Sequence, residues 1–190
     1  MVGPAPELPV TLGANVPKMN NADMQSTGFE LDLGWRDRIK DFDYSVHLLL
    51  SDDRQKILKY PNTTGKINTW YVGKYNGDIW GFETIGIAKS QEEMDAHLAS
   101  LPNGGQDALG VKWGAGDIMY RDLNGDGKIS DGATLNDPGD KKVIGNTSPR
   151  FRFGLDLNAS WKGIDVRLFF QGVAKRDAWL NDNMFWGATG

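Results

Sequence analysis

The chain lacks several features that would mark a class of protein. Its 190 residues include no cysteine and only two histidines, so disulfide bonds and thiol chemistry are absent. No apolar run approaches the roughly 18 residues of a membrane-spanning helix. The net charge of -4 argues against nucleic acid as a partner. His47 and His97 lie far apart in the sequence, which does not favour a histidine metal site.

The two ends of the chain also lack the signals of natural ends. Residues 1–7 have no basic region followed by an apolar stretch, so no signal peptide is expected. Residues 185–190 form an aromatic and glycine-rich stretch that resembles an interrupted loop. We therefore expect a piece of a longer protein, with an irregular lead-in over residues 1–26 and the start of a further loop over residues 174–190.

Aromatic residues and glycine, in contrast, are plentiful. The chain has seven tryptophans and 24 glycines, and 39% of its residues are hydrophobic. This is not the composition of a disordered protein. High tryptophan and glycine counts are typical of β-barrels with interfacial aromatics and glycine-rich turns.

Four segments alternate apolar and polar residues with a period of two, which indicates β-strands with two different faces. The predicted strands cover residues 27–36, 42–50, 150–161 and 164–173. Short turns join them in pairs, around residues 37–41 and at Lys162-Gly163. One face carries residues such as Phe29, Leu31, Leu155 and Leu157, and the other face carries charges of both signs.

Residues 52–149 separate the two predicted hairpins and are too many for a structureless loop. Short strands are predicted at residues 70–72 and 79–87, and an extended stretch at residues 116–121. Ser90 and Glu93 form a capping box, which predicts a helix that ends near residue 100. The connections thus alternate between short turns and a very long loop.

The fold class predicted from these patterns is all-β: antiparallel strands of a large transmembrane β-barrel with a long structured extracellular loop. Runs of about ten residues can cross a bilayer as tilted strands, and outer-membrane barrels have short periplasmic turns and long extracellular loops. A soluble β-sandwich also has alternating strands. Strand length, loop asymmetry and aromatics near the strand ends favour the barrel.

Residues 122–130 match the first nine positions of a calcium-binding loop. Asp122, Asn124 and Asp126 supply side-chain oxygens at positions one, three and five, Gly127 permits the sharp turn, and the Lys128 carbonyl would serve at position seven. Position twelve is an alanine, so a later acid, Asp131, Asp137 or Asp140, would have to complete the site. The alternative is an Asn-Gly/Asp-Gly turn with solvated acids. We predict a structural calcium ion.

Evidence for other chemistry is weaker. Aspartate and glutamate are plentiful enough to supply a pair of acids for glycoside hydrolysis. Acids of strands that face the lumen are expected to be solvated, however, and we predict no enzyme activity and no catalytic residue. Five aromatic residues of the long loop could stack on sugars or form a small core, and the core is favoured because they adjoin predicted strands. These residues are Trp70, Tyr71, Tyr75, Trp80 and Trp113. Substrate-binding residues stay unknown.

Several stretches together resemble the SusC/RagA family of TonB-dependent outer-membrane transporters. They include Gly28-Phe29-Glu30-Leu31, Gly34-Trp35-Arg36-Asp37, Ile79-Trp80-Gly81-Phe82-Glu83-Thr84, Gly116-Asp117-Ile118-Met119-Tyr120, Val143-Ile144-Gly145-Asn146 and Phe169-Phe170-Gln171-Gly172-Val173. The resemblance covers nearly the whole chain and is most specific from residue 116 to residue 173.

The resemblance implies a plugged barrel of about 22 strands that imports oligosaccharides or peptides. Its partners would be a SusD-like lipoprotein, TonB through a missing N-terminal part, and outer-membrane lipid. Residues 27–51 and 150–173 would then be barrel hairpins, and residues 52–149 an extracellular loop. The family places an acid just before the Val-Ile-Gly stretch, and here an insertion leaves Asp140 at that place. The alternative from another class is a soluble, calcium-stabilised, carbohydrate-binding β-sandwich.

Overall fold

The computed structural model describes residues 19–179 and divides into two compact units. We call the first the sheet unit. Its described residues are 24–56, 75–77 and 146–179. We call the second the loop unit, and it contains residues 57–74 and 78–145 together with residues 19–23. The chain passes from one unit to the other several times, and each unit is described below by itself.

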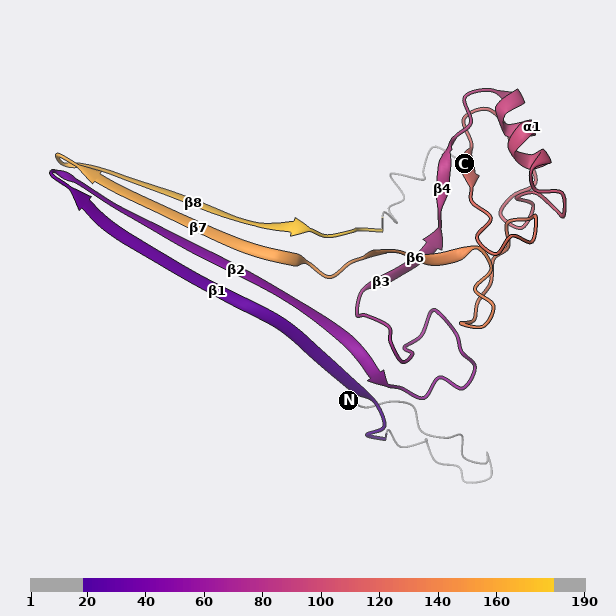
Figure 1. The fold of residues 1–190 in the computed structure, drawn as a ribbon, viewed down its shortest axis with the longest axis horizontal. Coiled ribbons are helices and arrows are strands. Elements are labelled where there is room, and N and C mark those ends of the chain that lie inside the picture. Colours follow the sequence, from indigo (N-terminus) through magenta and orange to yellow (C-terminus); the bar gives the residue numbers. More distant parts are fainter. Residues whose placement is uncertain (1–18, 180–190) are drawn as a thin grey trace, which may run out of the picture. The chain divides into compact units, whose positions relative to one another are not determined.

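The sheet unit is one four-stranded sheet with the strand order β1-β2-β7-β8 (Figure 1). The strands are β1 (Asp23–Ile39), β2 (Phe42–Lys59), β7 (Arg150–Trp161) and β8 (Ile164–Lys175). Two tight turns connect them in hairpins. Lys162 and Gly163 have φ angles of 49° and 85°, as the two central residues of a type I′ turn require. The hairpin predicted at Lys162-Gly163 is confirmed.

The register places the apolar side chains of three strands on one face of the sheet. Val46 of β2 pairs with Leu157 of β7, which pairs with Leu168 of β8. One residue further along β7, Asn158 pairs with Ser45 and with Arg167. Because adjacent residues of a strand point to opposite faces, the sheet has an apolar face and a polar face, as predicted. The apolar side chains are largely exposed within this chain.

The strands extend further than the alternation indicated. β1 begins at Asp23 and continues through Ile39, and β2 runs nine residues past Leu50 to Lys59. The second strand, predicted to end at residue 50, therefore ends nine residues later. Beyond Leu50, the Gln55 carbonyl accepts a hydrogen bond from the Asn76 amide at 2.8 Å, and Ile57 is hydrogen-bonded to Lys74 and Gly73. These bonds hold the backbone extended.

The loop unit has two small sheets and one helix. β3 (Asp78–Phe82) pairs with β6 (Lys141–Asn146), and β4 (Thr84–Ile87) pairs with β5 (Ile118–Tyr120). The strand predicted over residues 79–87 is thus two strands, β3 and β4, which are separated by Glu83. β6 was not predicted. Its short sequence has no clear alternation, and its partner β3 lies about 60 residues away in the chain.

The strand predicted at residues 70–72 is wrong, because this segment folds into turns. The ammonium group of Lys74 donates hydrogen bonds to the carbonyls of Ile67 and Thr69, both at 2.9 Å. It also lies 5.3 Å from the ring centre of Tyr71. Partial burial holds the pKa of Lys74 below its usual value, although Asp78 opposes the shift. The segment therefore curls around one cation instead of extending.

The helix α1 (Gln91–Ala99) forms where the capping box predicted it. The Ser90 hydroxyl accepts a hydrogen bond from the Glu93 amide at 3.3 Å. The Glu93 carboxylate reaches back to the amide of Lys89 at 2.7 Å, one residue before the usual target. No helix within residues 19–179 has the length and apolar character needed to cross a membrane.

A small core fixes α1 and β5 within the loop unit. Ala88, Met94 and Met119 are buried together, and Leu98 and Trp113 pack against them. Beside this core, the Gln106 side chain is fully buried. It donates to the Ile118 carbonyl and accepts from the Tyr120 amide. These bonds hold the strand that leads directly into the predicted calcium loop.

Candidate functional site

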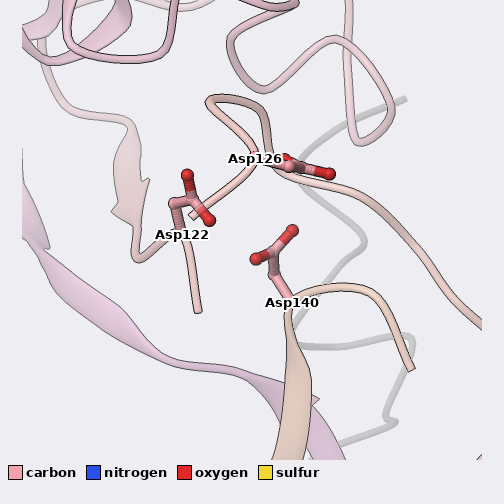
Figure 2. A group of neighbouring side chains, drawn as sticks. All are labelled: Asp122, Asp126 and Asp140. Atoms are coloured by element: carbon pink, nitrogen blue, oxygen red, sulfur yellow. The ribbon is translucent and has the colours of Figure 1, made fainter. Parts of the chain in front are cut away.

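Three carboxylates of the loop unit converge on one point (Figure 2). Asp122, Asp126 and Asp140 each offer an oxygen, and these oxygens lie within 4.8 Å of one another. Asp122 is the second residue after β5, and Asp140 immediately precedes β6. Of the later acids that the sequence left open, Asp140 is therefore the one that joins the group.

We call residues 122–130 together with Asp140 the acidic loop. Asp140 is fully buried, and its hydrogen bonds join the two ends of the segment 122–130. One of its oxygens accepts from the Leu123 amide at 2.7 Å. The other accepts from the amide and the hydroxyl of Ser130, at 2.6 and 3.1 Å. A buried carboxylate needs such donors, because an unpaired charge away from water is costly.

Asp122 closes the tight part of the loop. Its two oxygens accept from the amides of Gly125 and Gly127, at 2.6 and 2.8 Å. Both glycines have positive φ, 76° and 78°, a conformation that other residues rarely adopt. Desolvation opposes ionisation of Asp122, but these amides, the Asp126 amide and Asp140 together keep its pKa below the usual value.

The remaining predicted ligands lie on the same loop. The Asn124 amide oxygen accepts from the Asp126 amide at 2.9 Å, and its nitrogen contacts the Asp126 carboxylate at 3.2 Å. The Lys128 amide donates to Asp126 at 3.1 Å, so the backbone at position seven is held against the acidic group. These contacts make the loop compact.

The two acids that do not join the group have other partners. Asp131 forms an ion pair with Lys141. Asp137 accepts from the Gly139 amide at 3.4 Å in the turn that it shares with Thr134. The insertion over residues 132–139 therefore folds as a turn that also pairs with residues 65–67, and it returns Asp140 to the acidic loop. Sequence spacing alone could not select among the three acids.

The donor set consists of oxygens only, and it fits a hard divalent cation. Three carboxylates, one of them buried, together with the Asn124 side chain and the Lys128 carbonyl, are the kind of ligands that calcium takes. Carboxylates this close repel one another unless a cation or a proton lies between them. The described residues contain no histidine or cysteine near this group, so the chemistry does not favour zinc or copper.

Each of the two histidines contacts a protein side chain outside the group of three carboxylates. His47 Nε2 lies 2.6 Å from Asp32 on the polar face of the sheet, and His97 Nε2 lies 3.0 Å from Gln106 beside the small core. Within residues 19–179 the acidic loop contains the only group of three residues that could hold a metal ion.

Most of the loop aromatics that were considered for sugar stacking contact protein groups. Tyr71 and Trp80 form an edge-to-face pair and share a hydrogen bond of 3.1 Å. Trp113 packs on the small core and donates to the Gly110 carbonyl. These contacts favour the prediction that the aromatics form a small core.

Sequence reasoning missed a row of polar contacts across the sheet. Asp32 of β1 contacts His47 of β2, which pairs in register with Asp156 of β7. Asp156 in turn forms an ion pair with Arg167 of β8. The row belongs to the face opposite the apolar side chains, and only the register could reveal it.

The chain is similar in sequence to two known proteins. No protein-family model matches the chain. It is 30% identical over 178 residues to TonB-dependent receptor P26 of Formosa agariphila, covering 87% of this chain and 16% of that protein. It is 24% identical over 178 residues to TonB-dependent receptor P3 of the same organism, again covering 16% of the relative. These similarities support the TonB-dependent receptor family, and the chain spans about a sixth of these relatives' length.

Proposed function

We propose that the sheet unit is a wall segment of a TonB-dependent outer-membrane transporter. The single observation that carries the proposal is the register, which puts the apolar side chains of β2, β7 and β8 on one face and the polar row on the other. An outer-membrane barrel needs this division, with lipid on one side of its wall and water on the other. The similarity to two TonB-dependent receptors supports it.

The turns give the proposed wall its orientation. The β1–β2 and β7–β8 hairpins close with two residues each, whereas residues 60–149 separate β2 from β7. Short turns of such barrels are periplasmic and long connections are extracellular. The loop unit is therefore extracellular in this proposal, and its small core and capped helix explain how so long a connection is ordered.

The proposed cargo is an oligosaccharide or a peptide, and the proposed partner is a SusD-like lipoprotein. The support is the resemblance of residues 116–173 to the SusC/RagA family. Energy would come from TonB through a part of the protein outside this chain. No catalytic role is proposed.

The transport proposal is tested in cells that express the full-length protein. Uptake of labelled oligosaccharides should fall to background when the gene or TonB is removed, and a SusD-like lipoprotein should copurify with the transporter. Uptake that persists without TonB would contradict the proposal.

The acidic loop has a structural role in this proposal. Calcium would be held by Asp122, Asn124, Asp126, the Lys128 carbonyl and Asp140, and the ion would neutralise carboxylates that otherwise repel. It would stabilise the path from β5 to β6 within the loop unit. Isothermal titration of the chelator-treated transporter with calcium tests this role, with magnesium as the comparison ion.

The soluble β-sandwich gains no support from the sheet unit. A sandwich buries one face of each sheet against a second sheet. The described residues of this unit form a single sheet, whose apolar side chains, including Val46, Leu168 and Phe170, are 36–50% exposed. A lipid-facing wall accounts for this exposure directly.

A further inference from the structure

The outward rim of the sheet unit carries two cations, Arg54 and Lys56, near one aromatic ring. Arg54 and Lys56 lie on β2 beyond the apolar segment. Their charged groups are each 5.7 Å from the ring centre of Tyr75. Among residues 19–179, neither cation forms an ion pair with an acid. From this arrangement we propose a binding site for a phosphate-bearing lipid headgroup of the outer leaflet. The inference rests on the proposed function.

Two observations place these cations on the apolar, lipid-facing side. Arg54 and Lys56 continue the two-residue period of Leu48 and Leu50, which pair with apolar residues of β7. They also line one concavity of about 460 Å³ together with Phe29, whose side chain belongs to the apolar stripe of β1. The cations therefore extend the lipid-facing surface rather than the polar row.

The neighbouring acids are already neutralised. Asp52 is bound by Arg150 in a largely buried ion pair, and Asp53 is bound by Arg152. The rim thus keeps two uncompensated positive charges. Gln25 and Thr27 add an amide and a hydroxyl to the same concavity, and the Asp52 carboxylate, already bound by Arg150, also lines it. A ring, two cations and neutral donors suit a phosphate group joined to a lipid, because the anion meets the cations and the acyl chains continue over Phe29.

The height of the cations on the wall agrees with the headgroup layer. At about 3.3 Å per residue, Arg54 lies about 13 Å along the strand beyond Leu50. A strand tilted by about 40° converts this into about 10 Å above the last apolar pair. Long cationic side chains bend toward the interface from such positions.

The opposite rim of the same wall has a comparable pair. Lys162 lies 5.4 Å from the ring centre of Trp161, at the β7–β8 turn. Trp161 pairs with Phe42 and Ile164 on the apolar face. The ring of Trp161 has one cation beside it instead of two, and this rim would meet the inner leaflet. Lys162 therefore provides a matched control for the loss of positive charge at a lipid-facing rim.

The test uses the full-length transporter in phosphatidylcholine nanodiscs with and without phosphorylated lipid A, and native mass spectrometry counts the lipids retained. The double variant Arg54→Gln/Lys56→Gln should retain at least fivefold less lipid A than wild type, with unchanged phosphatidylcholine. Lys162→Gln and the charge-preserving variant Arg54→Lys/Lys56→Arg should stay within twofold of wild type. Equal retention by the double variant and wild type would overturn the proposal.

Two further arms identify the source of the anion. Inorganic phosphate and a soluble uronic-acid oligosaccharide are added as competitors, and neither should displace lipid A at millimolar concentration. Displacement by the oligosaccharide would overturn the lipid assignment in favour of a cargo site, and displacement by phosphate would reduce it to a free-anion site. Heat-modifiable migration of the wild type on gels shows separately whether the barrel forms. If the wild type lacks this migration, the proposed function is refuted. If the wild type migrates normally and the double variant retains as much lipid A as the wild type, only this inference is refuted.

Discussion

Asp52 of β2 and Arg150 of β7 form a two-pronged ion pair although 98 residues separate them in the chain. The side chains are only 9% and 15% exposed. The Asp52 carboxylate also accepts a hydrogen bond from the Phe151 amide at 3.2 Å, where Phe151 has a positive φ of 53°. The pair joins the two strands where the long connection leaves the sheet and where it returns.

Asp52→Ala should lower the stability of the assembled barrel. The substitution leaves the Arg150 guanidinium largely buried without its counter-charge, which is more damaging than losing an exposed pair. Asp52→Asn should have a smaller effect, because it keeps hydrogen-bond acceptors. The temperature at which the folded band disappears in heat-modifiability gels measures both. Asp53→Ala is the control, since its partner Arg152 is largely exposed, and a shift as large as that of Asp52→Ala would contradict the assignment.

Leu157→Arg should reduce assembled barrel far more than Asn158→Arg, although the two positions are adjacent. Leu157 lies between Val46 and Leu168 on the apolar face, whereas Asn158 contacts Ser45 and Asp156 on the polar face. A cationic side chain facing the middle of the bilayer costs about 2–4 kcal/mol, and one facing the lumen costs little. The fraction of heat-modifiable protein in outer-membrane preparations measures the difference. Equal loss, or the reverse order, would show that the faces are assigned the wrong way round.

Asp126→Ala should increase protease cleavage between residues 118 and 144 of the intact transporter in the presence of calcium, by several-fold. Removal of one ligand weakens calcium binding, and Asp122 and Asp140 then lie close together without a cation. A chelator should produce the same cleavage in wild type and add little in the variant. Asp107→Ala, an exposed acid outside the group, is the control. If cleavage of the wild type does not depend on calcium, the proposal that this loop binds calcium is contradicted.

Lowering the pH should reduce the stability of the β3–β6 region of the loop unit, because Glu83 becomes protonated. Its hydrogen bond with Lys142, helped by the charge of Arg121, keeps its pKa below the usual value. Because the folded pKa is lowered, the contribution to stability is present above the unfolded value of about 4.3 and is lost as the pH falls through the folded pKa. Hydrogen exchange of the Lys142 segment, corrected for intrinsic rates, should show the change. Glu83→Gln should weaken protection at neutral pH and abolish this part of the pH dependence, and an unchanged pH profile would contradict the role of Glu83.

The sequence determined the local features because each depends on residues that are close in the chain. The period of two fixes which side chains of one strand share a face, so the apolar stripe around Leu155 and Leu157 was readable. The turn at Lys162-Gly163 and the cap at Ser90 are likewise local. The spacing of Asp122, Asn124 and Asp126 predicted that their oxygens would gather on one side of a tight loop, and the structure brings Asp122 and Asp126 together.

Only the tertiary structure decided what depends on pairing between distant segments. The extension of β2 beyond Leu50, the polar row from Asp32 to Arg167 and the ion pair of Asp52 with Arg150 all arise from register, which no local pattern contains. The choice of Asp140 over Asp131 and Asp137 depended on how residues 132–139 fold back. The position of Arg54 and Lys56 beside Tyr75 also depends on contacts between distant segments. A charged side chain can bind an external ligand only when the fold leaves it without an opposite charge nearby.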